Sequence, residues 1–170
     1  MKVFFEYCIL IENNLIKGVC EDTMDLKFNS AGLLEPGIHT IKWDEFYDMY
    51  SFSDKRRALL IGLKKALHNL KQAGCPCVYI DGSFVTKKIE PNDFDACWHF
   101  HNGMDWSKLD PVFGIFDNGR LAQKVKFGGE FFPHSLPENG SGLTFLQFFQ
   151  KDRNTGSPKG IVRIELGNLQ

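Results

Sequence analysis

The hydrophobic positions of the chain predict one long helix between Asp54 and Ala73. Arg56 and Arg57, at its start, are expected on the surface or in an ion pair. Asp54 stands where the N-cap belongs, and Gly74 where a left-handed residue ends a helix. Apolar residues recur at three- and four-residue spacing, which places them on one buried side of the helix. They are Leu59, Leu63, Ala66, Leu67 and Leu70.

Two segments after this helix predict strands. Cys77–Ile80 is a short apolar run that ends at Asp81-Gly82-Ser83, as expected of a buried strand followed by a turn. Residues 93–100 (Asp-Phe-Asp-Ala-Cys-Trp-His-Phe) alternate strictly. Successive side chains of a strand point to opposite faces, so Asp93 and Asp95 are expected to share one face.

The C-terminal third has less regular patterns. Leu121–Phe132 predicts a strand interrupted by Gly128-Gly129, and Gly160–Leu166 predicts a short terminal strand. Leu143–Gln150 is apolar and aromatic and fits either a helix or a strand.

The N-terminal part predicts a strand, a loop and a short helix. Lys2–Ile11 is an apolar run typical of a strand, and Leu34–His39 contains a Pro-Gly pair typical of a loop. A short helix ending at Tyr50 is expected next, with Thr40 or Asp44 as its N-cap.

Composition fits one compact domain. The chain has 170 residues, of which 43% are hydrophobic and 24% charged, and sixteen Phe supply a large apolar area. Helical and strand patterns together predict an α/β (α+β) fold. We expect this single domain over residues 32–170, with residues 1–31 as an extension that forms a strand or hairpin.

Charge and cysteine content exclude several protein classes. Twenty basic and twenty-one acidic residues give a formal charge of −1, which argues against phosphate-dominated binding of nucleic acid. No window approaches the roughly 18 apolar residues of a membrane helix, and no signal peptide is recognisable. Five cysteines cannot all pair and are few for a disulfide scaffold. We therefore expect a soluble cytoplasmic protein with no membrane partner.

One group of residues is a candidate catalytic site, namely Gly82-Ser83 followed by Asp93 and Asp95. Gly-Ser after a strand lets the backbone approach a phosphate closely, while its N–H groups and the hydroxyl bind oxygens. Two carboxylates on one strand face supply the hard oxygen ligands that Mg²⁺ or Mn²⁺ prefers. Lys87, between the two pairs, is a candidate phosphate contact, with a solvated loop lysine as the alternative.

This spacing resembles the Gly-Ser…Asp-x-Asp motif of the DNA polymerase β-like nucleotidyltransferase superfamily. More of the chain is similar to a small uncharacterised bacterial and phage branch of it. The segments that carry this similarity are residues 32–39, 56–57, 81–86, 91–95, 148–153 and 159–161. The resemblance implies a minimal nucleotidyltransferase fold, in which a mixed, twisted sheet is flanked by helices. It also implies a third carboxylate on a later strand. Glu130 is the best candidate for it, although Gly129 before it and Asp81 before Gly82 depart from the usual apolar flanks.

The function expected from these features is metal-dependent transfer of a nucleoside monophosphate. A nucleoside triphosphate would be the donor, and the acceptor would be a hydroxyl of a protein, RNA or small molecule. Asp93, Asp95 and Glu130 would be the catalytic, metal-binding residues, while Gly82, Ser83 and Lys87 would bind the nucleotide.

The alternative is a catalytically silent module that binds a nucleotide or a protein partner, as a toxin–antitoxin component or a phage-encoded binder of a host factor. A Glu130 side chain that points to solvent or pairs with a remote lysine would favour this alternative.

Overall fold

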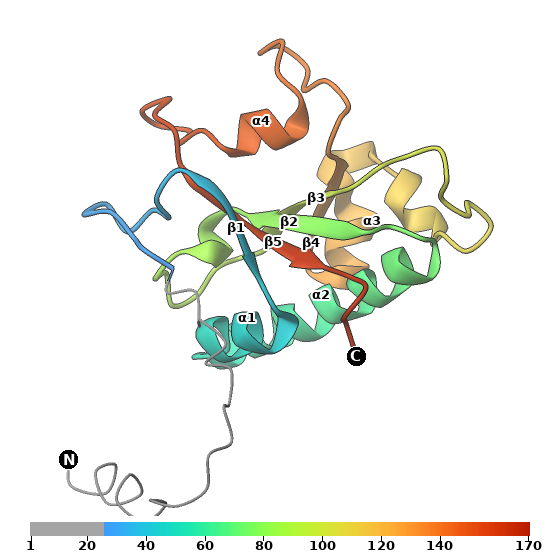
Figure 1. Cartoon of the computed structure of the whole chain (residues 1–170), viewed down its shortest axis with the longest axis horizontal. Coiled ribbons are helices and arrows are strands. Elements are labelled where there is room, and N and C mark those ends of the chain that lie inside the picture. Colours follow the sequence, from blue (N-terminus) through green and yellow to red (C-terminus); the bar gives the residue numbers. More distant parts are fainter. Residues whose placement is uncertain (1–25) are drawn as a thin grey trace, which may run out of the picture.

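A computed structural model of the protein describes residues 26–170. Its centre is one five-stranded mixed sheet with the strand order β1-β5-β2-β3-β4 (Figure 1). The strands are β1 (Gly37–Ile41), β2 (Cys77–Asp81), β3 (Phe94–Trp98), β4 (Gly129–Pro133) and β5 (Gly160–Glu165). β1 is parallel to β5 and β3 is parallel to β4, whereas β2 is antiparallel to β5 and to β3.

Helices lie on both sides of this sheet (Figure 1). They are α1 (Trp43–Tyr50), α2 (Asp54–Gln72), α3 (Asp117–Phe127) and α4 (Phe145–Phe149), with short 3₁₀ turns η1 (Ser83–Val85) and η2 (Pro111–Gly114). The predicted α/β class, with a mixed sheet flanked by helices, is confirmed. Among the helices of residues 26–170, none is long and apolar enough to cross a membrane.

Two apolar clusters hold the layers together. The larger one joins the buried stripe of α2, such as Leu63 and Leu67, to Ile80 and Phe94 on one face of the sheet. The smaller one lies on the opposite face, where Phe145, Leu146 and Phe149 of α4 pack against five buried sheet residues. Those five are Cys77, Tyr79, Cys97, Phe132 and Ile161. Both faces of the sheet therefore carry an apolar cluster, and among residues 26–170 the apolar residues packed on the second face come from the five-residue helix α4.

The predicted helix is confirmed, including its buried stripe, but its N-cap is Ser53 rather than Asp54. Ser53 has an extended backbone, and its hydroxyl accepts a hydrogen bond of 3.2 Å from the Arg56 N–H. Asp54 is instead the first helical residue, where a negative charge favours the N-terminal end of the helix dipole. Gly74 follows the helix with φ +87°, as expected of a left-handed residue there.

The strand predicted over Leu121–Phe132 is wrong for most of its length, because residues up to Phe127 belong to α3. Leu121 and Val125 are 54% and 79% exposed, so the apolar residues that suggested a strand lie on the helix surface. The buried position is taken by Gln123, whose amide hydrogen-bonds three backbone groups. Gly128, with φ +83°, ends the helix. Of the predicted strand, only the part that starts at Gly129 is a strand, namely β4.

The N-terminal predictions lie partly outside the described residues and are partly wrong. The strand predicted over Lys2–Ile11 and most of the predicted extension lie outside the described residues. The loop predicted over Leu34–His39 is partly wrong, because β1 starts at Gly37 and pairs with β5. The N-cap of α1 is Lys42, so neither Thr40 nor Asp44 has that role. Leu143–Gln150 contains the helix α4, whose N-cap Thr144 forms a capping box with Gln147.

We expect Gly62→Ala to destabilise the fold by about 1–3 kcal/mol, because a methyl group there overpacks the contact between α2 and α3. A Cβ atom at this position would lie 2.1 Å from the carbonyl oxygen of Phe127. Urea unfolding measures the change. Gly114→Ala is the control, since a Cβ atom there meets nothing within 4 Å. Equal unfolding midpoints for the two variants would contradict the expectation.

Candidate functional site

Sheet register brings three carboxylates side by side. Asp81 of β2 pairs with Asp95 of the antiparallel β3, and Asp95 pairs with Glu130 of the parallel β4. Cross-strand partners point to the same face, so the three residues form a row across three strands, here called the carboxylate row. Cys97, two residues after Asp95, belongs to the cluster under α4, so the row lies on that face of the sheet. Glu130 therefore lies on a later strand, and that strand is the neighbour of the one that carries Asp95.

Two cations from α3 approach the Glu130 end of the row. Lys124 Nζ lies 2.6 Å from Glu130 Oε1 and 3.3 Å from Asp93 Oδ2, so one ammonium joins both carboxylates. Its hydrogen bond to Glu130 raises the pKa of Lys124. Arg120 Nη1 lies 3.7 Å from the other Glu130 oxygen. Asp93 directly precedes β3, and this shared lysine ties it to the row.

At the other end of the row, Lys159 binds Asp81. Its ammonium lies 2.7 Å from both carboxylate oxygens, and the Asp81 side chain is only 4% exposed. Lys159 also lines a cavity of about 330 Å³ between the start of β1 and α4. The row therefore adjoins a hollow that is large enough for part of a small molecule.

Asp95, in the middle of the row, is the carboxylate without a counter-ion. Within residues 26–170, no cationic side chain lies within ion-pair distance of it. Burial, together with the negative charges of Asp93, Glu130 and Asp81, raises the pKa of Asp95 to about 7. The centre of the row therefore holds more negative charge than its cations balance, an arrangement that favours an additional cation.

Gly82 packs directly against this central carboxylate. Its backbone has φ +84° and ψ −169°, a combination that is essentially restricted to glycine. A Cβ atom there would lie 2.7 Å from Asp95 Oδ2 and 3.4 Å from the Asp95 nitrogen. The Gly-Ser turn can therefore lie against Asp95 only because residue 82 has no side chain. Ser83 follows immediately as the first residue of η1.

Arg56 holds the loop that follows this turn, contrary to its expected place on the surface or in an ion pair. Its side chain is fully buried, and its guanidinium donates to the carbonyl oxygens of Phe84, Thr86 and Lys88 at 2.6–2.9 Å. The first helical turn of α2 carries Arg56, so these bonds tie the loop to a rigid element. Arg57, in contrast, is exposed and pairs with Asp54 as expected.

The structure thus brings together Gly82, Asp93, Asp95 and Glu130 among the predicted site residues. Lys87 is exposed on the loop, and its phosphate contact stays a prediction, as does a Ser83 hydroxyl that faces the aspartates. Sequence patterns missed the cations Lys124 and Arg120. Both lie on the helix α3, whereas the pattern predicted a strand that started at Leu121.

Carboxylate oxygens are the ligands that Mg²⁺ and Mn²⁺ prefer, so Asp93, Asp95 and Glu130 fit such an ion in their chemistry. The unbalanced charge on Asp95 supports the same fit. In the part of the chain that the structure describes, no group of three or more His, Cys, Asp or Glu side chains is gathered closely enough to hold a metal. The Lys124 ammonium contacts both Asp93 and Glu130.

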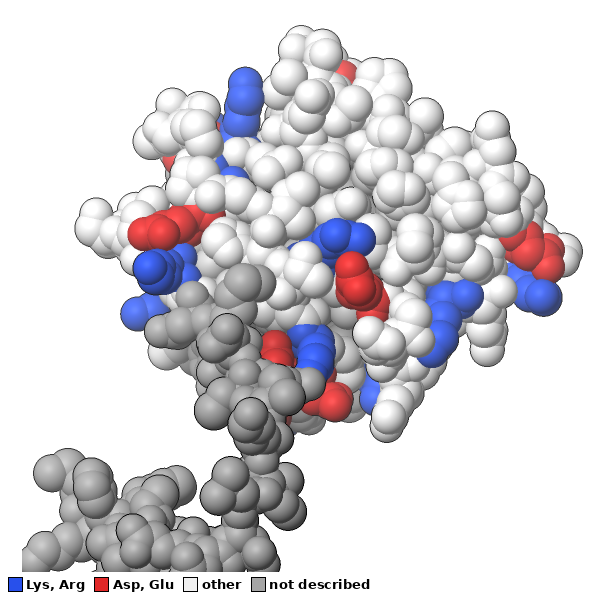
Figure 2. Space-filling model, viewed as in Figure 1, with Lys and Arg blue, Asp and Glu red and all other residues white. Residues whose placement is uncertain are grey.

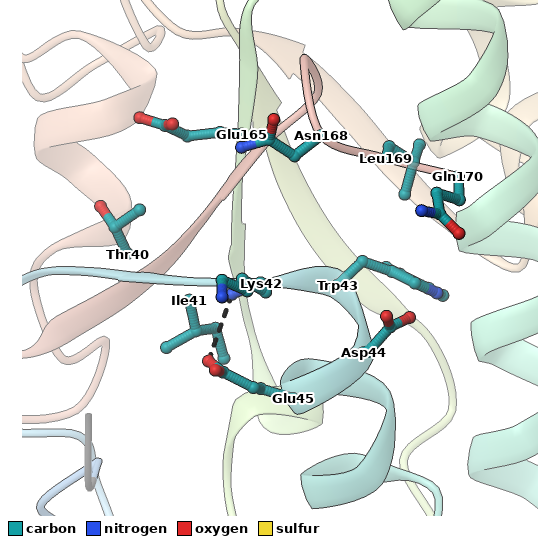
Figure 3. A pocket seen from close by; sticks show the side chains of 10 residues that line it. All are labelled: Thr40, Ile41, Lys42, Trp43, Asp44, Glu45, Glu165, Asn168, Leu169 and Gln170. Carbon is teal, nitrogen blue, oxygen red and sulfur yellow. Dashed lines mark hydrogen bonds between the residues drawn. The ribbon is translucent and has the colours of Figure 1, made fainter. Parts of the chain in front are cut away.

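A larger cavity, of about 610 Å³, lies elsewhere, at the ends of β1 and β5 (Figure 3). Asp44, Glu45 and Glu165 line it, and Glu45 accepts a hydrogen bond of 3.3 Å from the Lys42 backbone. None of the predicted site residues is part of this lining. β2 and β5 are antiparallel, so this cavity and the Asp81 end of the row lie at opposite ends of the strands.

Surface charge is mixed on the face seen in Figure 2. Where this face is formed by described residues, Lys and Arg side chains are interspersed with Asp and Glu and separated by uncharged surface. Phosphate-dominated binding of nucleic acid needs a continuous basic surface, which this face does not offer.

Comparison with known proteins identifies the family. Residues 26–165 match the model described as Family of unknown function (DUF6932), and the chain belongs to that family. No curated protein and no solved structure matches the chain. The matched range contains all five strands and the whole carboxylate row.

We expect Arg56→Lys to destabilise the protein by about 3 kcal/mol or more. Lysine cannot reproduce the forked donors, and the loop carbonyl oxygens would stay buried without partners. Chemical denaturation measures the loss, with the exposed Arg57→Lys as the matched control, for which a change within about 0.5 kcal/mol is expected. An Arg56→Lys midpoint equal to that of the control would show that the loop does not depend on these bonds.

Asp95 should make the protein less stable as the pH rises from about 4 to 7. Its folded-state pKa of about 7 exceeds the usual 3.8, so the folded protein binds more protons than the unfolded chain in that range. Above pH 7 the free energy of unfolding stops falling, after a total decrease of a few kcal/mol. Thermal unfolding in EDTA should therefore show Asp95→Asn more stable than wild type at pH 8 and nearly equal to it at pH 4.

Asp117→Asn is the control for this pH dependence, since Asp117 is an exposed aspartate on α3. It should follow the wild-type curve. An Asp95→Asn curve parallel to wild type across this pH range would rule out the raised pKa.

Proposed function

We propose that the protein transfers a nucleoside monophosphate from a nucleoside triphosphate to a hydroxyl acceptor, with Mg²⁺ or Mn²⁺ as cofactor and pyrophosphate as the second product. The observation that supports this most is the central position of Asp95. It lies between Glu130 on one neighbouring strand and the Gly82 turn on the other. Two carboxylates beside a Gly-Ser turn are the parts that a metal–triphosphate complex requires.

Each group has a role that follows from its place. Asp93, Asp95 and Glu130 would hold the cation, which when bound would neutralise the negative charge of the triphosphate. The N–H groups and hydroxyl of the Gly82-Ser83 turn would bind phosphate oxygens. Glu130 would accept the proton of the attacking hydroxyl at its carboxylate, since it is the member of the row farthest from the turn. The acceptor is a protein, an RNA or a small molecule.

A second candidate is the catalytically silent binding module, and the Lys124 contacts favour it. The Lys124 ammonium already neutralises Asp93 and Glu130, as a structural ion-pair network would. In that case the protein would bind a nucleotide or a protein partner without turning the nucleotide over. Release of pyrophosphate therefore separates the two candidates.

We expect Asp95→Asn to weaken binding of nucleoside triphosphates in Mg²⁺ and to reduce any transfer by about 10³-fold or more. The amide keeps the shape but removes the charge that holds the cation, and phosphoryl-transfer catalysis depends mainly on positioning and neutralisation. Ser83→Ala should cost only about 1 kcal/mol, several-fold in affinity, because it removes one neutral hydrogen bond.

Calorimetry with each of the four ribonucleoside triphosphates, with and without Mg²⁺, measures both effects. Asp117→Asn serves again as a charge-matched control and should bind as wild type does. Equal binding by Asp95→Asn and wild type in Mg²⁺ would remove the metal role, and binding that is indifferent to Mg²⁺ would favour the silent module.

A further inference from the structure

An unusual backbone turn directs Arg120 toward the carboxylate row. Asn118, Gly119 and Arg120 have φ values of 49°, 61° and 54° with ψ between 35° and 45°, so three successive residues are left-handed. Non-glycine residues rarely adopt this conformation, and the continuous right-handed part of α3 follows Arg120. The guanidinium carbon of Arg120 lies 3.8 Å from the centre of the Phe132 ring, on β4.

Aromatic rings hold this guanidinium without using its donors. Besides Phe132, the rings of Phe116 and Phe145 lie 5.1 Å and 5.8 Å from its carbon atom. Arg120 Nε is buried, and no hydrogen-bond partner for it lies among residues 26–170. The contact with Glu130, at 3.7 Å, is too long for a hydrogen bond.

Arg120 therefore differs from the two other cations of this region that face the row. Lys124 is hydrogen-bonded to Glu130 at 2.6 Å, and Lys159 is bound to both oxygens of Asp81. Glu130 already has its close counter-ion in Lys124, so neutralising Glu130 does not explain why the chain holds a second, poorly hydrogen-bonded cation beside it. An oriented guanidinium with unused donors is suited to an anionic ligand.

We propose that Arg120 binds phosphate oxygens of a substrate at the Glu130 end of the carboxylate row. This inference rests on the proposed function and adds a phosphate subsite to it. The planar fork of guanidinium donors matches phosphate better than an ammonium does, and stacking on Phe132 fixes its plane before the ligand arrives.

The phosphate has two possible sources, the triphosphate of the donor or a phosphate group on the acceptor. The Gly82 turn and Glu130 lie on opposite sides of Asp95, so Arg120 stands across the row from the turn that would bind the triphosphate. Two binding experiments distinguish the sources. In the first, a non-hydrolysable ATP analogue with Mg²⁺ is titrated into the protein. In the second, inorganic phosphate is titrated into protein saturated with that analogue.

Arg120→Gln should weaken one of these two equilibria by about 10- to 100-fold, and Arg120→Lys by several-fold, because lysine keeps the charge but not the fork. Lys126→Gln is the matched control on α3, since Lys126 pairs with Asp110 instead of the row, and it should bind as wild type does. A loss in the first titration assigns the donor's phosphates, and a loss in the second assigns the acceptor's.

The inference is overturned if Arg120→Gln, folded as judged by its thermal unfolding, binds in both titrations as wild type does, or if wild type binds in neither. The proposed function fails separately, when Asp95→Asn binds the Mg²⁺ analogue complex as tightly as wild type. A phosphate subsite that depends on Arg120 would survive that result.

Discussion

The buried guanidinium of Arg56 is the interaction on which the site depends. It lies in the first turn of α2, has no solvent exposure, and donates to three carbonyl oxygens of the loop after Gly82-Ser83. A buried charge is costly unless its donors are satisfied, so helix and loop must keep this arrangement. The loop begins at the turn that packs on Asp95 and leads into β3, and one helix residue thereby restrains the path between the two halves of the site.

Mixed strand directions explain how residues distant in sequence meet in the carboxylate row. Antiparallel pairing of β2 and β3 places Asp81 opposite Asp95, while parallel pairing of β3 and β4 places Glu130 on its other side. A register shift by one residue on β4 would turn Glu130 to the opposite face, into the apolar layer against α2. Gly129 opposes such a shift because it fits where a Cβ atom would meet the Phe94 ring at 2.4 Å.

Sequence patterns predicted the parts of the site that depend on local periodicity. The stripe of α2, the alternation around Asp95 and the strand position of Glu130 all follow from the spacing of apolar residues. The positions of Lys124 and Arg120 were not predicted, because the helix α3 lacks a regular apolar stripe. Gln123 replaces an apolar residue on its buried side, while Leu121 and Val125 face solvent. Arg56 was also missed, since burial of a charged residue depends on carbonyl groups thirty residues away that no local pattern reveals.

Charge balance links the two candidate functions. Four carboxylates, Asp81, Asp93, Asp95 and Glu130, meet three cations, so the cluster keeps a deficit centred on Asp95. Lys159 is committed to Asp81 by two contacts of 2.7 Å, whereas the Lys124 ammonium is shared between two acids and is 36% exposed. A divalent cation that displaced Lys124 would both remove the deficit and release an ammonium beside the row. When Asp95 is protonated, the three cations balance the three remaining carboxylates. When all four carboxylates are ionised, the cluster is neutral only with an added cation.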